Sequence, residues 1–341
     1  MTAPHVAGGH ELTVRRGQFW VPGERVATDY GTVQRAPMFV SWEAPPESVH
    51  PVPLVLVHGG GGQGTDWTGT PDGRPGWATR LVEAGFAVYV VDRCGHGRSP
   101  YHPDVVAPMG AQLPYEAARA LFLPEESRAA QTQWICERDV GSDHLDQLVC
   151  PMGPLPADLA ESQRLDADRL ARLLDIVGEA VLVTHSAGGP VGWLTAAARP
   201  GRVRGIAAIE PVGPPYAEIP GLGTLTWGLT SAEMPCDPPA GFPEEVAGRR
   251  IPGLADKPVA VVTGGASAFA DFAPQVVDFL NGAGAAARRM HLPDLGITGN
   301  GHGLIFEANS DETVKPVIDW ILTTVAPQQQ QAAERTKGRT S

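Results

Sequence analysis

A serine, a glutamate and a histidine occur in this chain at positions where they could together carry out acyl transfer. Ser186 lies between an apolar run at 180–183 and helix-forming residues at 187–198. This pattern predicts a tight strand-turn-helix elbow that lifts the serine hydroxyl clear of a sheet. Gly188 fits the usual G-x-S-x-G pattern, whereas Thr184 stands in place of its first glycine. The structural alternative is a serine that only caps the following helix.

A serine hydroxyl attacks a carbonyl only when a base removes its proton and a third group orients that base. Glu210 directly follows the apolar run 203–209, which indicates the next parallel strand. His302 lies in the glycine-rich loop 300–303, and catalytic residues are common in such loops. The order predicts that Ser186 is the nucleophile, His302 its base and Glu210 the acid.

Asp271 is the alternative acid. It is the first carboxylate after the apolar run 259–263, which indicates a further strand. Its surroundings, Ser-Ala-Phe-Ala-Asp-Phe, are more typical of the start of a helix than of a strand end. Glu210 is therefore the more direct assignment.

A glycine-rich turn, His-Gly-Gly-Gly-Gly-Gln-Gly at 58–64, follows the apolar run 54–57. Glycines let backbone N–H groups come close to a ligand. We expect the amides of Gly60 and Ala187 to hold the oxyanion of a tetrahedral intermediate. The alternative is a glycine loop without a chemical role.

The same turn also matches another class of enzyme. Gly59, Gly61 and Gly64 satisfy the dinucleotide-binding fingerprint, and Asp92 ends the next expected strand, 87–91. A nicotinamide-dependent oxidoreductase is therefore an alternative. A single glycine fingerprint is a weak signal, and that reading leaves the serine, glutamate and histidine without a role.

Four motifs together make the chain resemble the α/β-hydrolase superfamily of serine esterases and lipases. They are the H-G-G-G turn, the D-x-x-G-x-G-x-S loop at 92–99, the T-H-S-A-G elbow and the N-G-H-G loop, and the resemblance spans about 54–325. A glutamate after the sixth strand is similar to bacterial carboxylesterases of the esterase 713 type. The resemblance implies an α/β fold with a mostly parallel central sheet flanked by helices. It also implies hydrolysis of a small-molecule ester, with a cyclic ester (a lactone) as the nearest variant.

The expected mechanism uses an acyl-enzyme and needs neither a metal nor an organic cofactor. A non-catalytic ligand-binding protein on the same scaffold is an alternative of another class. A complete set of serine, histidine and acid argues against it, because a binder needs none of the three.

The chain of 341 residues, 43% of them hydrophobic, is long enough for one large domain, expected over 1–326. Residues 11–44 predict an antiparallel entry of two or three strands, followed by alternating strands and helices. The Pro-rich insertions 99–162 and 212–255 are expected to form a cap over the serine. We expect 327–341 to be a mobile polar tail.

Taken together, aromatic and apolar residues in the two insertions favour a hydrophobic pocket for a small to medium apolar ester, whereas any one of them is expected to pack into a core beneath a long loop. They are Tyr115, Phe122, Trp134, Tyr216, Trp227, Met234 and Phe242.

A net charge of −12 disfavours nucleic acid as a partner. The sequence shows no membrane span and no apolar leader, so a cytoplasmic protein is expected. The oligomeric state is open, and a homodimer is one outcome. Four cysteines show no C-x-x-C pair; Cys136 and Cys150 could form a disulfide in an oxidising compartment, but free buried thiols are expected.

Overall fold

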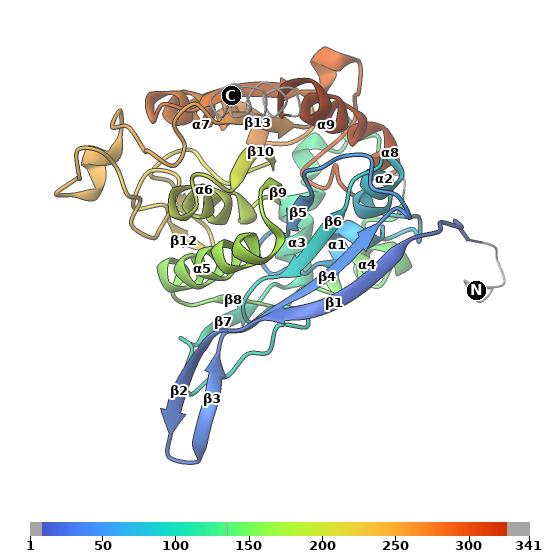
Figure 1. Ribbon diagram of the computed structural model, residues 1–341. Helices are drawn as coiled ribbons and strands as arrows, with labels where there is room; N and C mark the ends of the chain where they lie inside the picture. Colours follow the sequence, from blue (N-terminus) through green and yellow to red (C-terminus); the bar gives the residue numbers. More distant parts are fainter. Residues whose placement is uncertain (1–8, 135, 326–341) are drawn as a thin grey trace, which may run out of the picture.

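An eight-stranded sheet forms the centre of the computed structural model, which describes residues 9–134 and 136–325 (Figure 1). The strand order is β1-β4-β6-β5-β9-β10-β13-β14. The six strands from β6 to β14 are parallel, while β4 is antiparallel to both β1 and β6. The expected mostly parallel sheet is confirmed. The bounds are β1 (Arg15–Val21), β4 (Met38–Ala44), β5 (Leu54–Val57), β6 (Val88–Asp92), β9 (Ala180–His185), β10 (Val203–Ile209), β13 (Pro258–Thr263) and β14 (Ala286–His291).

The central strands are buried on both faces, which explains their unbroken apolar sequences. Every residue of β5, β9 and β13 is buried. Val, Leu and Ile run continuously through a parallel strand because helices cover both of its sides. The polar residues that follow these strands therefore meet at one edge of the sheet.

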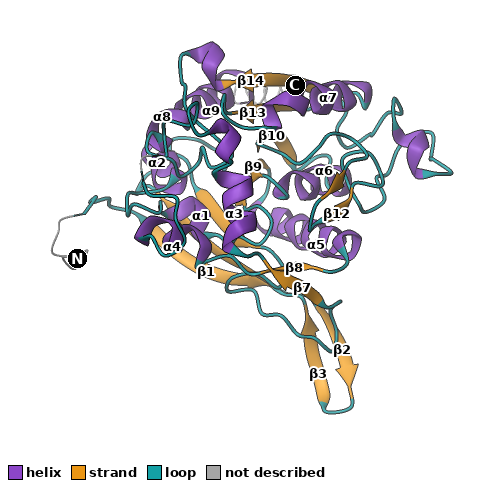
Figure 2. Cartoon of the chain, turned by 180° about the vertical axis from the view of Figure 1, so that it is seen from behind, coloured by secondary structure: helices purple, strands orange, loops and turns teal. Residues whose placement is uncertain are grey.

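Two layers of helices cover the sheet (Figures 1 and 2). One layer packs its apolar residues into a common core with the sheet and comprises α5 (Leu159–Val177), α6 (Gly188–Ala198) and α7 (Phe269–Gly282). The residues of the second core come from α2 (Trp77–Glu83), α3 (Tyr115–Phe122), α4 (Asp143–Val149) and α9 (Lys315–Trp320). The helical segment near the end of the described chain is divided into α8 (Ser310–Thr313), α9 and a π turn (Ile321–Val325).

The N-terminal region differs from the expectation of two or three strands. It holds four, because β2 (Glu24–Thr28) and β3 (Gly31–Arg35) form a hairpin that projects from the body (Figures 1 and 2). Ala36 has a φ of +48° and separates β3 from β4. An alanine rarely adopts this left-handed conformation, so the residue type at position 36 does not mark the break.

The two insertions contain ordered elements and do more than cover the sheet. The first carries β7 (Met109–Gln112), α3, a 3₁₀ turn (Glu125–Ser127), α4, β8 (Pro154–Pro156) and the first residues of α5. The second carries β11 (Glu218–Ile219), β12 (Gly223–Thr224) and a 3₁₀ turn (Pro243–Val246). Residues of α3 and α4 belong to the second core, so part of the first insertion is scaffold rather than cap.

No helix in the part of the chain that the structure describes is long and apolar enough to cross a membrane. All four cysteines are free, and only Cys94 is buried, so the expectation of buried thiols is wrong for the other three. The expected tail, 327–341, lies outside the described residues.

Candidate active site

Ser186 is at the apex of a tight turn between β9 and α6. Its φ is +51°, a left-handed conformation that costs a non-glycine residue roughly 1–2 kcal/mol. A Cβ on Gly188 would lie 2.7 Å from the His58 carbonyl oxygen, so this position requires glycine. Thr184 fits in place of the usual first glycine because Gly192 of α6 faces its methyl group, at 3.0 Å from a Cβ built there. The chain thus forms the expected elbow despite its departure from the pattern.

Glu210 directly follows β10, the strand next to β9 in the sheet. Its side chain is fully buried, and its N–H donates to the Val262 carbonyl at 2.8 Å. Oε1 accepts from the Gly264 N–H at 2.6 Å, and Oε2 accepts from the Ser267 hydroxyl. Both donors come from the loop between β13 and α7, and the alternative acid, Asp271, follows this loop in the first turn of α7. Sequence reasoning did not assign Ser267 a role, because a hydroxyl four residues beyond a strand carries no motif.

His302 joins the other two residues. Its Nε2 lies 3.0 Å from Ser186 Oγ, and its Nδ1 lies 3.3 Å from Glu210 Oε2. Asp271 instead lies exposed in the first turn of α7, as its sequence surroundings indicated. The structure therefore brings Ser186, His302 and Glu210 together, and Glu210 rather than Asp271 contacts the histidine.

Burial sets the charge states of the histidine and the glutamate. It lowers the pKa of His302, which keeps the imidazole neutral and able to accept a proton. It raises the pKa of Glu210, while the bonds from Ser267 and Gly264 oppose this rise. Every hydrogen bond recorded at the Glu210 carboxyl can use it as an acceptor, which suits the ionised form. With Nδ1–H directed to Glu210, Nε2 is free to accept the serine proton.

A buried glutamate supports the histidine loop from behind. Glu307 accepts hydrogen bonds from the Gly301 N–H at 3.0 Å and from Asn300 Nδ2 at 2.9 Å. Gln131 of the first insertion also donates to it, at 2.7 Å. Burial raises the pKa of Glu307 to about 7. His185, the residue before the serine, also contacts this loop, because its Nε2 lies 3.0 Å from the His302 carbonyl oxygen. No motif in the sequence indicated the role of Glu307.

The glycine turn lies against the elbow. A Cβ on Gly60 would lie 3.4 Å from the Cβ of Ala187, and one on Gly59 would lie 3.0 Å from the Cβ of Ser186. Neither the Gly60 nor the Ala187 N–H donates to another residue that the structure describes. Two backbone donors beside the serine hydroxyl are what an oxyanion site requires.

The dinucleotide alternative does not fit the same turn. Asp92 is buried and accepts from the Gly64 N–H at 2.7 Å and from Arg98, so its carboxylate is occupied rather than open to a ribose. The helix after the turn, α1 (Thr65–Thr68), has only four residues. A phosphate-binding fingerprint would instead open a full helix of a βαβ unit.

Apolar side chains from both insertions cover the site. Leu155 and Leu222 lie 3.3 Å and 3.7 Å from a Cβ built on Gly60. A small apolar cluster of Ala187, Val212 and Leu225, with Leu222 packed against it, borders the elbow. Together they place an apolar surface next to the serine.

Most of the aromatic and apolar residues of the insertions that favoured a pocket lie away from the serine. Phe122 alone among them contacts the site, with its ring centroid 5.2 Å from that of His302. Trp134 and Met234 belong to the two main cores, and Trp227 packs against the first of them. Phe242 is exposed. Phe269, which was not singled out, packs against the same histidine, with its ring centroid 4.1 Å from that of His302.

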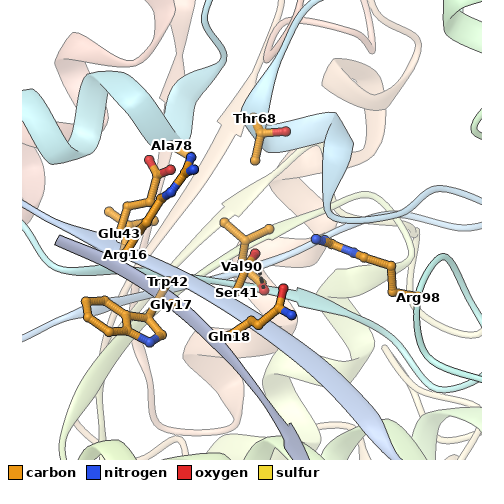
Figure 3. Close-up of a pocket in the computed structure, with 11 residues that line it drawn as sticks. Arg16, Gly17, Gln18, Ser41, Trp42, Glu43, Thr68, Ala78, Val90 and Arg98 are labelled. Carbon is orange, nitrogen blue, oxygen red and sulfur yellow. Dashed lines mark hydrogen bonds between the residues drawn. The ribbon is translucent and has the colours of Figure 1, made fainter. Parts of the chain in front are cut away.

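A separate depression of about 430 Å³ lies against β1, β4 and β6 (Figure 3). Arg16, Gln18, Glu43 and Arg98 are among its lining residues, and it includes none of the serine, histidine or acid. Within residues 9–134 and 136–325, no group of three or more His, Cys, Asp or Glu side chains could hold a metal ion.

The chain is similar to known hydrolases. Residues 52–229 match the family described as alpha/beta hydrolase fold. The chain is 31% identical over 319 residues to "Probable secreted lipase phiG" of a fungal species (strain ATCC 74256), covering 85% of this chain and 87% of the relative. A solved structure described as a novel bacterial esterase superposes with a TM-score of 0.69 at 25% identity, covering 94% of this chain and 99% of that one.

Proposed function

Since the chain belongs to the alpha/beta hydrolase fold family and is a hydrolase of the lipase and esterase type, we propose that it hydrolyses a carboxylic ester through an acyl-enzyme on Ser186. The observation that carries the proposal is the pair of contacts at His302. One ring nitrogen lies 3.0 Å from the serine oxygen and the other 3.3 Å from Glu210. A nucleophile, its base and an orienting acid are thereby in hydrogen-bond order.

In the first step, His302 takes the proton of Ser186 while the serine oxygen attacks the ester carbonyl. Glu210 holds the Nδ1–H and stabilises the imidazolium that forms. The amides of Gly60 and Ala187 bind the oxyanion, and the imidazolium then protonates the leaving alcohol. Water attacks the acyl-enzyme in the second step, with His302 again as the base. The free enzyme and a carboxylic acid result.

The expected substrate is a small to medium ester with an apolar acyl group. Leu155 and Leu222 lie over Gly60, and Val212 packs with Ala187, the residue after the serine. A lactone is also an ester, so the same residues would open a cyclic substrate. A panel of linear p-nitrophenyl esters and apolar lactones distinguishes these two substrates by their kcat/KM values.

The test combines turnover with covalent labelling. Wild-type protein should hydrolyse a short p-nitrophenyl ester and incorporate one fluorophosphonate at Ser186, identified by peptide mass spectrometry. Ser186→Ala should lower turnover by several orders of magnitude, as deletions of such nucleophiles cost roughly 10⁶-fold. Ser162→Ala, which changes another buried serine on α5, is the matched control and should keep full activity.

Other results would point to other functions. A folded wild-type protein with neither turnover nor labelling would be a ligand-binding protein. Labelling at a different serine would refute the assignment of Ser186.

The location and assembly of the protein are further parts of the proposal. We expect a cytoplasmic enzyme, and the relative described as secreted makes export the competing outcome. Esterase activity that remains with the cell lysate supports the first, and activity in the culture medium supports the second. Size-exclusion chromatography with light scattering tests for a homodimer.

A further inference from the structure

A buried ion pair lies behind the glycine turn and has no part in the mechanism above. Arg93, in the loop after β6, is 1% exposed, and Asp166, on α5, is fully buried. Arg93 Nε donates to Asp166 Oδ2 at 2.7 Å, and Asp166 Oδ1 accepts from the Cys94 N–H at 2.8 Å. A buried ion pair is a weak source of stability, because desolvating two charges offsets their attraction. Its contacts therefore call for another explanation.

The guanidinium reaches the backbone of the glycine turn. Arg93 Nη1 donates to the Gly59 carbonyl oxygen at 3.3 Å, and His58 Nδ1 lies 2.9 Å from the same oxygen. The Arg93 N–H donates to His58 Nε2 at 2.9 Å, so that nitrogen is unprotonated and the proton is on Nδ1. Burial lowers the pKa of His58, which keeps this ring neutral. Two donors, one of them charged, thus hold the Gly59 carbonyl.

The direction of that carbonyl determines the direction of the next amide. The Gly59–Gly60 peptide is trans, so its C=O and N–H lie in one plane and point in opposite directions. Because the oxygen faces His58 and Arg93, the Gly60 N–H faces away from them. Hydrogen bonds to a carbonyl also polarise the peptide and make its N–H a stronger donor, the more so in a buried, low-dielectric site.

We propose that Arg93, held by Asp166 and assisted by His58, is a positioning residue that orients and polarises the Gly59–Gly60 peptide for binding of the oxyanion. The inference rests on the proposed function, because it assigns a task within the same hydrolytic site. Its distinct content is that a cation without contact to the substrate stabilises the transition state through one peptide bond.

The test removes the cation without leaving an unpaired buried charge. In the double variant Arg93→Met/Asp166→Asn, the amide oxygen can still accept from the Cys94 N–H. We expect kcat per fluorophosphonate-titrated site to fall roughly 10- to 100-fold. Removal of a whole oxyanion donor lowers kcat by about 10²- to 10³-fold, so the expected loss is at most comparable with it. KM should stay within about twofold. The Ki of a trifluoromethyl ketone, which forms an oxyanion on the serine, should rise in parallel with the loss in kcat.

Two further variants separate this role from a structural one. Arg169→Met removes another buried guanidinium, which lies on α5, the helix that carries Asp166. This guanidinium bonds to the Ala36 carbonyl and not to the glycine turn. The substitution should lower the melting temperature but leave kcat per titrated site unchanged. Arg93→Lys keeps the charge, and its smaller loss of kcat than in the double variant would support a role for the charge.

The outcomes are distinct. An unchanged kcat and ketone Ki in a folded double variant would overturn the inference, as would an equal kcat loss in Arg169→Met. If the double variant does not fold, a folded Arg93→Gln protein, which lacks the cation, would overturn the inference by showing wild-type kcat and ketone affinity. Failure of the wild-type protein to label at Ser186 would refute the proposed function itself.

Discussion

Replacing Glu210 with glutamine should prevent His302 from acting as the base while leaving the fold intact. The Gly264 N–H, at 2.6 Å, will hold the amide oxygen of the new side chain. The amide NH₂ then faces His302 Nδ1, where Glu210 now presents an acceptor at 3.3 Å. To accept from that NH₂, Nδ1 must lose its hydrogen, and the ring proton moves to Nε2. Because Nε2 then donates toward Ser186, it can no longer take the serine proton.

The size of the effect follows from this change of tautomer. The equivalent loss of charge in a related triad lowers kcat by about 10⁴. At 1.36 kcal/mol for each factor of ten, that is about 5.4 kcal/mol of transition-state stabilisation. Stability should not fall with it. Burial raises the pKa of Glu210, so the wild-type protein loses stability as pH rises through that pKa, and a neutral glutamine is free of this loss.

The assay is kcat for a p-nitrophenyl ester, per titrated site, with the melting temperature measured alongside. Asp271→Asn is the matched control, because it makes the same chemical change at an exposed residue of α7 and should cost less than about twofold. A Glu210→Gln enzyme that retains most of its activity while Asp271→Asn loses it would refute the assignment of the acid. Similar partial losses in both would refute the tautomer argument.

Three other substitutions give measurable outcomes. Ser267→Ala removes a hydrogen bond that lowers the pKa of Glu210, so this pKa rises and the acid limb of the kcat/KM profile should move to higher pH; an unmoved limb would contradict this. Glu307→Gln places an amide NH₂ against the Gly301 N–H. An unsatisfied buried group costs about 1–3 kcal/mol, so we expect kcat to fall roughly tenfold. Burial raises the pKa of Glu307 to about 7, so wild-type stability should fall as pH rises through that value, and thermal melts of the variant should lack this step. Leu222→Ala removes apolar surface over the turn and should lower kcat/KM for an octanoate ester roughly tenfold, with acetate nearly unchanged; equal losses for both esters would make Leu222 scaffold.

The sequence predicted the parts of the site that follow strands of strong apolar pattern. Ser186 and Glu210 each come directly after such a strand, and parallel strands end at one edge of a sheet. Their proximity was therefore predictable before any contact was known. The closeness of the glycine turn to the serine was predictable on the same grounds, because the turn follows β5, which lies next to β9 in the sheet.

Predictions that depended on composition alone were less successful. The aromatic residues of the insertions favoured an apolar pocket when taken together and core packing when taken singly, and most of them pack into or against the two cores. A Pro-rich segment with aromatic side chains is compatible with either location, because both bury apolar surface. The leucines that do lie over Gly60 had no distinguishing pattern in the sequence.

The sequence by itself determined the order of the chemical groups and the strands that carry them, because these are local properties of pattern and spacing. Only the tertiary structure decided which groups support them. Ser267 reaches Glu210 and Glu307 reaches the histidine loop, while Arg93 contacts the Gly59 carbonyl from the turn after a neighbouring strand. Such contacts join residues from separate elements, and a hydrogen bond depends on distances of a few tenths of an ångström that no sequence pattern encodes.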